Sequence, residues 1–328
     1  MDAHLDDDAI AELPPEMPGG LTFHLPMELA ALREAGASAD ELDRRRRERL
    51  DEAWSNGLVD PPLYRWAVQR YGDTARRLLS GDEREVAAAL DDIAPLADGL
   101  AGAAFHGLIR LGYAVWQRDA AEVARGLAYL RTRRQVLSSG AGPSGDRPSL
   151  DLDLPAADDR DGVTVFDMLD LAAGTGRTHL LDQRSSSPRA LAASAAALVR
   201  RNPSSFVAVH AVTGLHALCE LHVLVADEPL TGEQPPNSLA AWWRAYALAA
   251  QACRMVVDTT PPEALAAFVA DDGPVSDLDH LVRASVASAE THDVKLAVSL
   301  RRLAAFGVLS VDEALQTGVA RLAAGQLL

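Results

Sequence analysis

The chain has 328 residues, 48% hydrophobic and 24% charged, a size that can bury a core without disulfides or a structural metal. Its 31 basic residues against 47 acidic ones leave a formal net charge of −16, which repels phosphate backbones and argues against nucleic-acid partners. The chain has two cysteines, Cys219 and Cys253, and their spacing does not match a zinc site. So few cysteines exclude a disulfide framework and lead us to expect a reducing, cytoplasmic setting.

Residues 1–20 mix acids, Pro and Gly, and they predict a poorly ordered acidic lead-in. This segment lacks the basic start of a secretion signal. The apolar runs of the chain stay shorter than the roughly 18 residues that a membrane span needs, so no membrane association is expected. Residues 21–328 are predicted to form one domain.

From Pro26 onward, Ala, Leu, Arg and Glu dominate and apolar residues recur at three- and four-residue spacing, which predicts helices. Helices are expected at 26–36, 39–55, 60–80, 83–97, 100–117, 119–136, 163–173, 188–201, 204–224, 237–256, 262–270, 275–288, 289–306 and 311–325. No period-two segment is long enough to propose a sheet. The predicted fold class is therefore all-α, a compact multi-helix bundle.

A polar stretch rich in Gly, Pro, Ser and Asp, residues 137–162, predicts a long loop. A loop of this length inside a compact domain is usually functional or disordered, and this one could separate two helical lobes around a shared site. A second charged feature, the arginine-rich run 43–49, lies on an expected helix and is flanked by acids. It predicts a solvated, salt-bridged helix face, with a partner-docking patch as the alternative.

The nine histidines are the candidate metal ligands. The chain has no HExxH motif, no pair of ExxH motifs and no GxSxG elbow, so ligands would have to converge from separate helices. Four histidines have contexts that position the ring: His24 before a helix that Pro26 begins, His106 beside Gly107, His210 in an apolar segment, and His292 three residues before Lys295. His216 and His222 lie on faces rotated by about 120° from that of His210, and one of them could join from a neighbouring face.

Lys295 is the only lysine among the 31 basic residues. The codon bias of a GC-rich genome explains why arginine replaces lysine elsewhere, because Ala and Gly are also abundant here. It does not explain why one lysine remains next to a histidine.

Four ordered blocks carry a resemblance to the questin oxidase-like family, which includes fungal enzymes of anthraquinone and aflatoxin-type polyketide pathways and many bacterial homologues. The blocks are His24-Leu25-Pro26-Met27-Glu28-Leu29 (followed by Leu32 and Gly36-Ala37-Ser38), His106-Gly107-Leu108-Ile109-Arg110 (running to Tyr113-Ala114), His210-Ala211-Val212-Thr213, and His292-Asp293-Val294-Lys295. The resemblance covers residues 20–306. The chain departs from the fungal pattern in being shorter, in having Arg110 after the second block, and in its lower loop content.

The resemblance implies an all-α protein with mononuclear non-haem Fe(II). Its implied ligands are His24, His106, His210, His292 and Lys295, with the lysine carboxylated by CO2 on its side-chain nitrogen. Such a set is chemically coherent, because four neutral imidazoles suit Fe(II) and a carbamate would add an anionic oxygen. Burial and a nearby cation favour the neutral lysine amine that reacts with CO2, whereas arginine offers no nucleophilic amine.

The activity implied by the resemblance is that of an O2-dependent oxygenase. Its substrate would be a small aromatic or polycyclic molecule of polyketide type, with C–C cleavage or Baeyer–Villiger-like oxygen insertion as the outcome. Arg110, Tyr113 and Thr213 follow implied ligands along their helices, and they are candidates to support the ligands or contact substrate. The alternative for each is a buried hydrogen bond or salt bridge.

The competing interpretation is a non-catalytic helical interaction or scaffold protein that keeps the family fold. Aromatic residues make up only 5% of the chain, which does not favour a large flat-ring pocket. The residues that could still line one are Tyr113, Trp116, Trp242, Trp243 and Tyr246. The sequence leaves open the substrate, the need for an external reductant, and whether the chain forms a homodimer.

Overall fold

The computed structural model describes residues 7–137, 187–226, 230, 239–258 and 275–325. The expected helices at 163–173 and 262–270 lie outside these residues, as does the expected loop at 137–162 except for its first residue.

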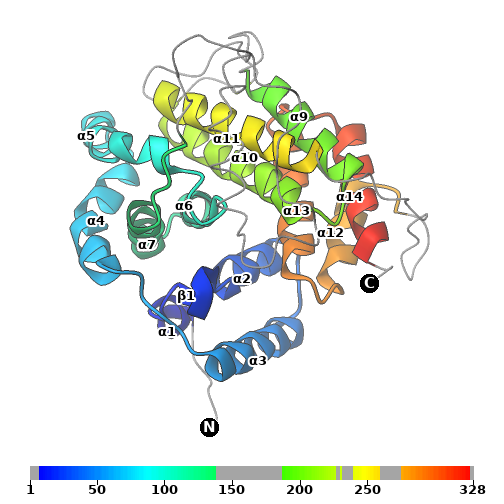
Figure 1. Ribbon diagram of the computed structural model, residues 1–328, viewed down its shortest axis with the longest axis horizontal. Coiled ribbons are helices and arrows are strands. Elements are labelled where there is room, and N and C mark those ends of the chain that lie inside the picture. Colours follow the sequence, from blue (N-terminus) through cyan, green and yellow to red (C-terminus); the bar gives the residue numbers. More distant parts are fainter. Residues whose placement is uncertain (1–6, 138–186, 227–229, 231–238, 259–274, 326–328) are drawn as a thin grey trace, which may run out of the picture.

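The predicted all-α fold is confirmed, since the described residues form helices and one two-stranded sheet (Figure 1). In the N-terminal half the helices are α1 (Asp7–Ala11), α2 (Leu25–Glu34), α3 (Ala39–Asn56), α4 (Tyr64–Leu78), α5 (Glu83–Ile93), α6 (His106–Gln117) and α7 (Ala120–Thr132). In the C-terminal half they are α9 (Pro188–Arg201), α10 (Phe206–Val225), α11 (Ala240–Asp258), α12 (Leu278–Val286), α13 (Thr291–Ala305) and α14 (Val311–Gly325). Two 3-10 helices span Pro18–Gly20 and Ala94–Gly99.

The segment expected to be a poorly ordered lead-in differs from that expectation over residues 7–20. After α1, the strand β1 (Glu16–Met17) pairs antiparallel with β2 (Leu21–Thr22). Glu16 is buried and accepts hydrogen bonds from Arg133, while Ile10 packs in a small apolar cluster with Phe23 and Leu25. These long-range contacts anchor a segment whose composition alone resembles a flexible one.

Helix α10 packs against four other helices, α6, α9, α11 and α13 (Figure 1). Every residue from Val207 to His222 is buried. The helix is long and apolar enough to cross a membrane, but 89% of its most apolar stretch is covered by the rest of the protein, as expected for a core helix. Its apolar character is therefore explained by its place in the fold.

Glycines on α6 allow its neighbours to approach closely. A Cβ on Gly112 would lie 2.4 Å from Cα of Ala217 on α10, and one on Gly107 would lie 2.7 Å from the backbone nitrogen of Leu130 on α7. These contacts hold the start of α6 firmly between two helices.

Candidate metal centre

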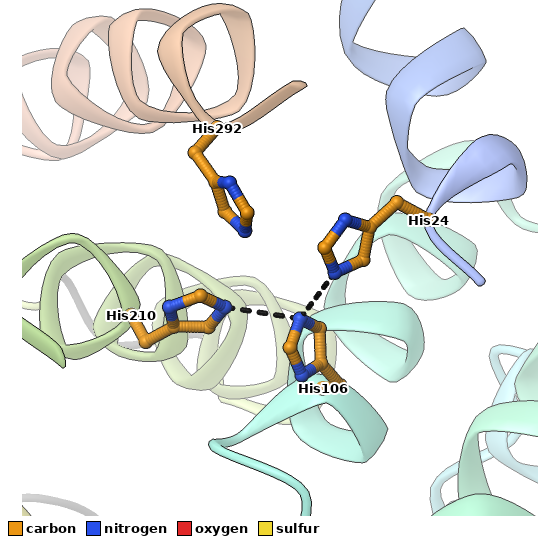
Figure 2. Close-up of side chains that lie close together, drawn as sticks. All are labelled: His24, His106, His210 and His292. Carbon is orange, nitrogen blue, oxygen red and sulfur yellow. Dashed lines mark hydrogen bonds between the residues drawn. The ribbon is translucent and has the colours of Figure 1, made fainter. Parts of the chain in front are cut away.

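The structure brings together the four histidines of the implied ligand set, from four segments far apart in the sequence. His24 directly precedes α2, His106 begins α6, His210 lies in the first turns of α10, and His292 lies in the first turn of α13. Figure 2 shows the four rings converging from these helix ends. One ring nitrogen from each lies within 4.8 Å of the corresponding atoms of the other three.

The spacing of these nitrogens fits donors that share one ion. Nε2 of His106 is 2.8 Å from Nε2 of His24 and 3.0 Å from Nε2 of His210. Two nitrogens bound to one ion at 90°, each at about 2.0–2.1 Å, would lie about 2.8–3.0 Å apart. The observed distances therefore match neighbouring positions around a transition metal.

Hydrogen bonds on the outer ring nitrogens settle which nitrogens face inward as lone pairs. Nδ1 of His106 donates to the carbonyl of Ala103, and Nδ1 of His210 donates to the carbonyl of Phe206 at 2.7 Å. Because a carbonyl only accepts, each Nδ1 carries the ring proton. The neutral rings then present unprotonated Nε2 atoms to the centre, which is the tautomer that metal-ligating histidines adopt.

This assignment leaves the Nε2 atoms of His106 and His210 facing each other as two acceptors only 3.0 Å apart. Such a contact requires a positive charge between them, either a proton or a metal ion. A proton is disfavoured, because burial and the charge of Lys295 lower the pKa of His210 to about 3. Burial, followed by the charges of His210 and Lys295, holds the pKa of His106 well below its usual range. A metal cation fits this pair better than a proton.

His292 is oriented by the residue that begins its own helix. Glu290 caps α13 by accepting the backbone N–H of His292, and it also accepts from Nδ1 of the same residue at 2.5 Å. Nε2 of His292 is buried without a hydrogen-bond partner in the described structure. A carboxylate on one ring nitrogen with the other nitrogen free is the usual arrangement behind a metal-bound histidine.

Lys295 lies one turn after His292 on α13 and is 1% exposed. Its Nζ has no hydrogen-bond partner among the described residues. Burial lowers the pKa of Lys295 to about 8. After burial, the charge of Lys295 is the largest cause that depresses the pKa values of His24 and His292. A buried, unpaired lysine at this position fits an amine that is neutral or modified when the centre is assembled.

An unusual backbone turn delivers His106 to the cluster. The three preceding residues, Ala103, Ala104 and Phe105, all have positive φ, at 50°, 50° and 65°. Left-handed conformations cost L-residues roughly 1–2 kcal/mol each. Because a right-handed helix cannot run through these left-handed residues, α6 begins at His106 rather than near residue 100, as the periodicity had suggested. The same turn places the Ala103 carbonyl against the ring.

A buried ion network holds α13 against α2 and α3. The fully buried Glu28 carboxylate pairs with Nε of Arg45 at 3.2 Å and with Nε of Arg49 at 3.0 Å. Both arginines also donate to the carbonyl of Ala289, just before α13. The arginine-rich run was expected to be a solvated face, but these two members turn inward because Glu28 and the Ala289 carbonyl need partners.

A second contact fixes the same end of α13 from the opposite side. Arg321 on α14 donates to Asp293 at 2.7 Å and to the carbonyl of Pro203 at 2.8 Å. Asp293 also accepts from Ser288 at 2.6 Å. The backbone around His292 and Lys295 is thus held between two ion-paired arginine groups, which limits how far either side chain can move.

A cavity of about 520 Å³ opens beside His24 and His106. Its lining residues are Met17, Gly19, Gly20, Leu21, Thr22, Phe23, His24, Arg49, Glu52, Ala104, His106, Phe206, Ala289, Glu290 and Thr291. Its aromatic residues are Phe23 and Phe206. The tryptophans and tyrosines considered from the sequence do not line it, and Trp242, Trp243 and Tyr246 are buried in the core on α11.

The three proposed supporting residues lie elsewhere. The Arg110 guanidinium forms a two-pronged ion pair with Glu122, and together with Tyr113 it lines a separate cavity of about 480 Å³. Thr213 donates to the carbonyl of Val209 within its own helix. None of them lines the cavity beside the histidines, so the alternative of buried structural bonds describes Arg110 and Thr213 better. The spacing of these residues from an implied ligand along the helix did not predict where their side chains lie, because hydrogen-bond partners outside the cluster determine the positions of Arg110 and Thr213.

His216 and His222 do not join the cluster. His216 is paired with Glu220 and Ser299, and the His222 ring packs edge-on against Trp243 at 5.9 Å between centroids. The positioning groups that sequence reasoning missed are Glu28, Arg45, Arg49, Phe206, Glu290 and Arg321. Only Glu290 had a local signal, since acids are enriched in the first turn of a helix and Glu290 lies at the start of the expected helix 289–306.

Comparison of the chain with protein-family models, with curated proteins and with solved structures found no match. The case for a metal centre therefore depends on the geometry and chemistry of these residues.

Proposed function

We propose that this chain is a mononuclear non-haem iron oxygenase that acts on an aromatic or polycyclic substrate in the cavity beside His24 and His106. The observation that carries the proposal is the contact between the Nε2 atoms of His106 and His210, 3.0 Å apart with both outer nitrogens protonated. Iron and the substrate class come from the resemblance to questin oxidase-like proteins.

Four imidazoles would hold the ion, and a carboxylated Lys295 would supply the anionic oxygen. Four neutral imidazoles alone would leave the +2 charge of the ion uncompensated in a buried site. Lys295, buried one turn after His292, would correct this, because a carbamate carries a negative charge where an ammonium would repel the ion. Bound Fe(II) would supply a place where dioxygen binds and is activated, and the oxidisable substrate would supply electrons for its reduction.

The protein would contribute orientation and exclusion of water. Glu290 and the carbonyls of Ala103 and Phe206 hold three rings in the tautomer that points Nε2 inward. A substrate bound in the cavity would lie next to two of the proposed ligands, against a lining that includes Met17, Phe23 and Phe206. C–C cleavage and Baeyer–Villiger-like oxygen insertion are the two outcomes considered for such a substrate.

The decisive experiment compares metal content and lysine modification. Protein reconstituted with Fe(II) without oxygen should retain about one equivalent of iron after gel filtration, and isotope-labelled bicarbonate should give a carbamate signal in its carbon NMR spectrum. Lys295→Arg should lose both, because guanidinium cannot form the carbamate and places a permanent cation beside the ion. Lys295→Ala should lose both as well, and small carboxylates such as formate should partly restore its iron binding.

Activity is tested with a panel of hydroxylated polycyclic aromatics and isotope-labelled dioxygen. Incorporation of labelled oxygen into a product supports the oxygenase, and the product mass separates cleavage from insertion. Normal iron content in Lys295→Arg would overturn the carboxylated-lysine assignment. A wild-type protein that retains no transition metal would favour the helical scaffold interpretation.

A further inference from the structure

Phe206, the first residue of α10, lies against three of the four histidines. Its ring centroid is 3.9 Å from that of His210, 4.8 Å from that of His292 and 6.3 Å from that of His106. Its backbone carbonyl also accepts the Nδ1 proton of His210. A single residue thus contacts the cluster through both its ring and its backbone.

The apolar core does not account for this ring. Phe206 is 39% exposed and belongs to neither of the two apolar clusters of the described structure. It lines the cavity beside the histidines. An exposed phenylalanine that packs on imidazoles and faces a cavity gains little from core burial, so its position needs another explanation.

Only two of the four histidines line the cavity. His24 and His106 are part of its lining, whereas His210 and His292 are not. The two histidines outside the lining are the two whose rings lie closest to the Phe206 ring. The Phe206 ring therefore covers the His210–His292 side of the cluster and leaves the His24–His106 side open.

We infer that Phe206 is a specificity-determining wall of the substrate site. It confines exogenous ligands to the His24–His106 side, excludes water from the His210–His292 side, and offers its exposed face to a planar aromatic substrate. This inference deepens the proposed function and rests on it. Stacking against a phenylalanine ring favours flat, uncharged molecules. The cavity rim supports that choice, because the two carboxylates Glu52 and Glu290 disfavour anions and the donors of Arg49 already bind Glu28, Glu52 and Ala289.

The test uses two probes that do not require turnover. Mn²⁺ reports the water that reaches the ion through proton relaxation, and 2-naphthol, a planar and uncharged fluorophore, reports binding in the cavity. The variants are Phe206→Ala, Phe206→Leu, and the control Leu21→Ala, which removes another exposed side chain of the cavity lining, on β2. Because both side chains, Phe206 and Leu21, are exposed in the wild type, folding should survive in all three variants, and thermal melting checks this.

Phe206→Ala should raise the water relaxation of the Mn²⁺-loaded protein and release the ion to a chelator about 10-fold faster. It should also weaken 2-naphthol binding about 3–10-fold. Phe206→Leu should keep water out but weaken 2-naphthol, because it preserves bulk without the ring. Leu21→Ala should resemble the wild type in relaxation and ion release.

Several outcomes would overturn the inference. Unchanged relaxation and unchanged 2-naphthol affinity in Phe206→Ala would show that the ring neither shields the ion nor contacts the ligand. Equal effects of Leu21→Ala would show a general loosening of the cavity. Failure of the wild type to bind 2-naphthol would also contradict the role of Phe206 as a wall that planar aromatic molecules stack against. Failure of the wild type to bind Mn²⁺, with 2-naphthol still sensitive to Phe206, would instead contradict the metal centre.

Discussion

Helices α10 and α13 each contribute buried polar groups to two clusters, about two turns apart, that have opposite chemistry. The first is the His24–His106–His210–His292 centre. The second is built around His216, whose Nδ1 is 3.0 Å from Ser299 and whose Nε2 is 3.0 Å from Glu220. Arg302 completes the second cluster with an ion pair to Glu220 at 2.7 Å.

The difference lies in which polar atoms find partners inside the protein. Both ring nitrogens of His216 are bonded to neighbouring side chains. In the first cluster Nδ1 of His106, His210 and His292 is bonded, while Nε2 of His292 and Nζ of Lys295 have no partner in the described structure. Buried polar atoms without partners are unfavourable unless a ligand completes them. Burial of histidines alone thus does not distinguish the two clusters, whereas inward-facing nitrogens without a partner do.

The largest expected difference between the two clusters is the loss of metal binding when a histidine is replaced by alanine. Single replacements His24→Ala, His106→Ala, His210→Ala and His292→Ala should each weaken iron binding by more than the 10–100-fold typical of losing an outer partner, since each removes a donor. His216→Ala should keep its metal and lose about 1–3 kcal/mol of stability, because Glu220 loses a buried partner. Equilibrium dialysis and thermal melting measure the two effects. Full metal retention in all four cluster variants would refute the site, as would metal loss confined to His216→Ala.

A smaller effect is expected from the group that orients His292. Glu290→Gln should weaken metal affinity by about 10–100-fold, because the amide is a poorer acceptor for the Nδ1 proton. Glu52→Gln is the matched control, since Glu52 lines the same cavity and is similarly exposed but bonds to Arg49. Competition with a chromophoric chelator gives both affinities. Equal losses in the two variants would point to the general charge of the rim instead of the orientation of His292.

The metal-free protein should be acid-labile because of the first cluster. The pKa of His210 is lowered, chiefly by burial, from 6.5 to about 3. Between these values the unfolded chain binds a proton that the folded chain does not, so stability falls as the pH drops from 6.5 toward 3. The contribution of this residue is at most about 1.4 kcal/mol per pH unit. Urea unfolding across this range should show a shallower pH slope for metal-free His210→Asn than for the wild type. Identical slopes would contradict the assignment of a buried neutral imidazole.

Much of the fold follows from local signals, as two helices illustrate. The expected helix 188–201 matches α9 because Ser187 caps it and Pro188 begins it. The expected helix 204–224 nearly matches α10 (Phe206–Val225), which Ser205 caps. In both cases the residues next to the helix end determine the boundary, through helical periodicity and capping preferences.

Prediction of the candidate site depended on the resemblance, because the spacing of residues along the chain does not reveal the long-range contacts that form it. The four histidines come from four helix ends, and no local pattern specifies that those ends meet. The inward turn of Arg45 toward Glu28 and Ala289 joins residues that are far apart along the chain. For Arg110 the sequence predicted a place near the site that the structure does not show. Its position on the helix suggested the site, but the ion pair with Glu122 determines where its side chain lies.

The smallest effect should come from the strained turn before His106, which has no counterpart in the His216 cluster within the middle of α10. Ala104 has a φ of 50°, a conformation that glycine adopts without penalty. Ala104→Gly should therefore stabilise the metal-free protein by about 0.5–1 kcal/mol, the left-handed penalty less the extra backbone entropy of glycine. Ala87→Gly, at an exposed position inside α5, is the matched control and should destabilise by about 1 kcal/mol. Chemical unfolding of the metal-free variants measures both signs. If Ala104→Gly also relaxes the turn that aims His106, it should bind metal more weakly despite its greater stability, because the ring is then less restrained. Destabilisation equal to that of Ala87→Gly would show that the turn before His106 stores no strain.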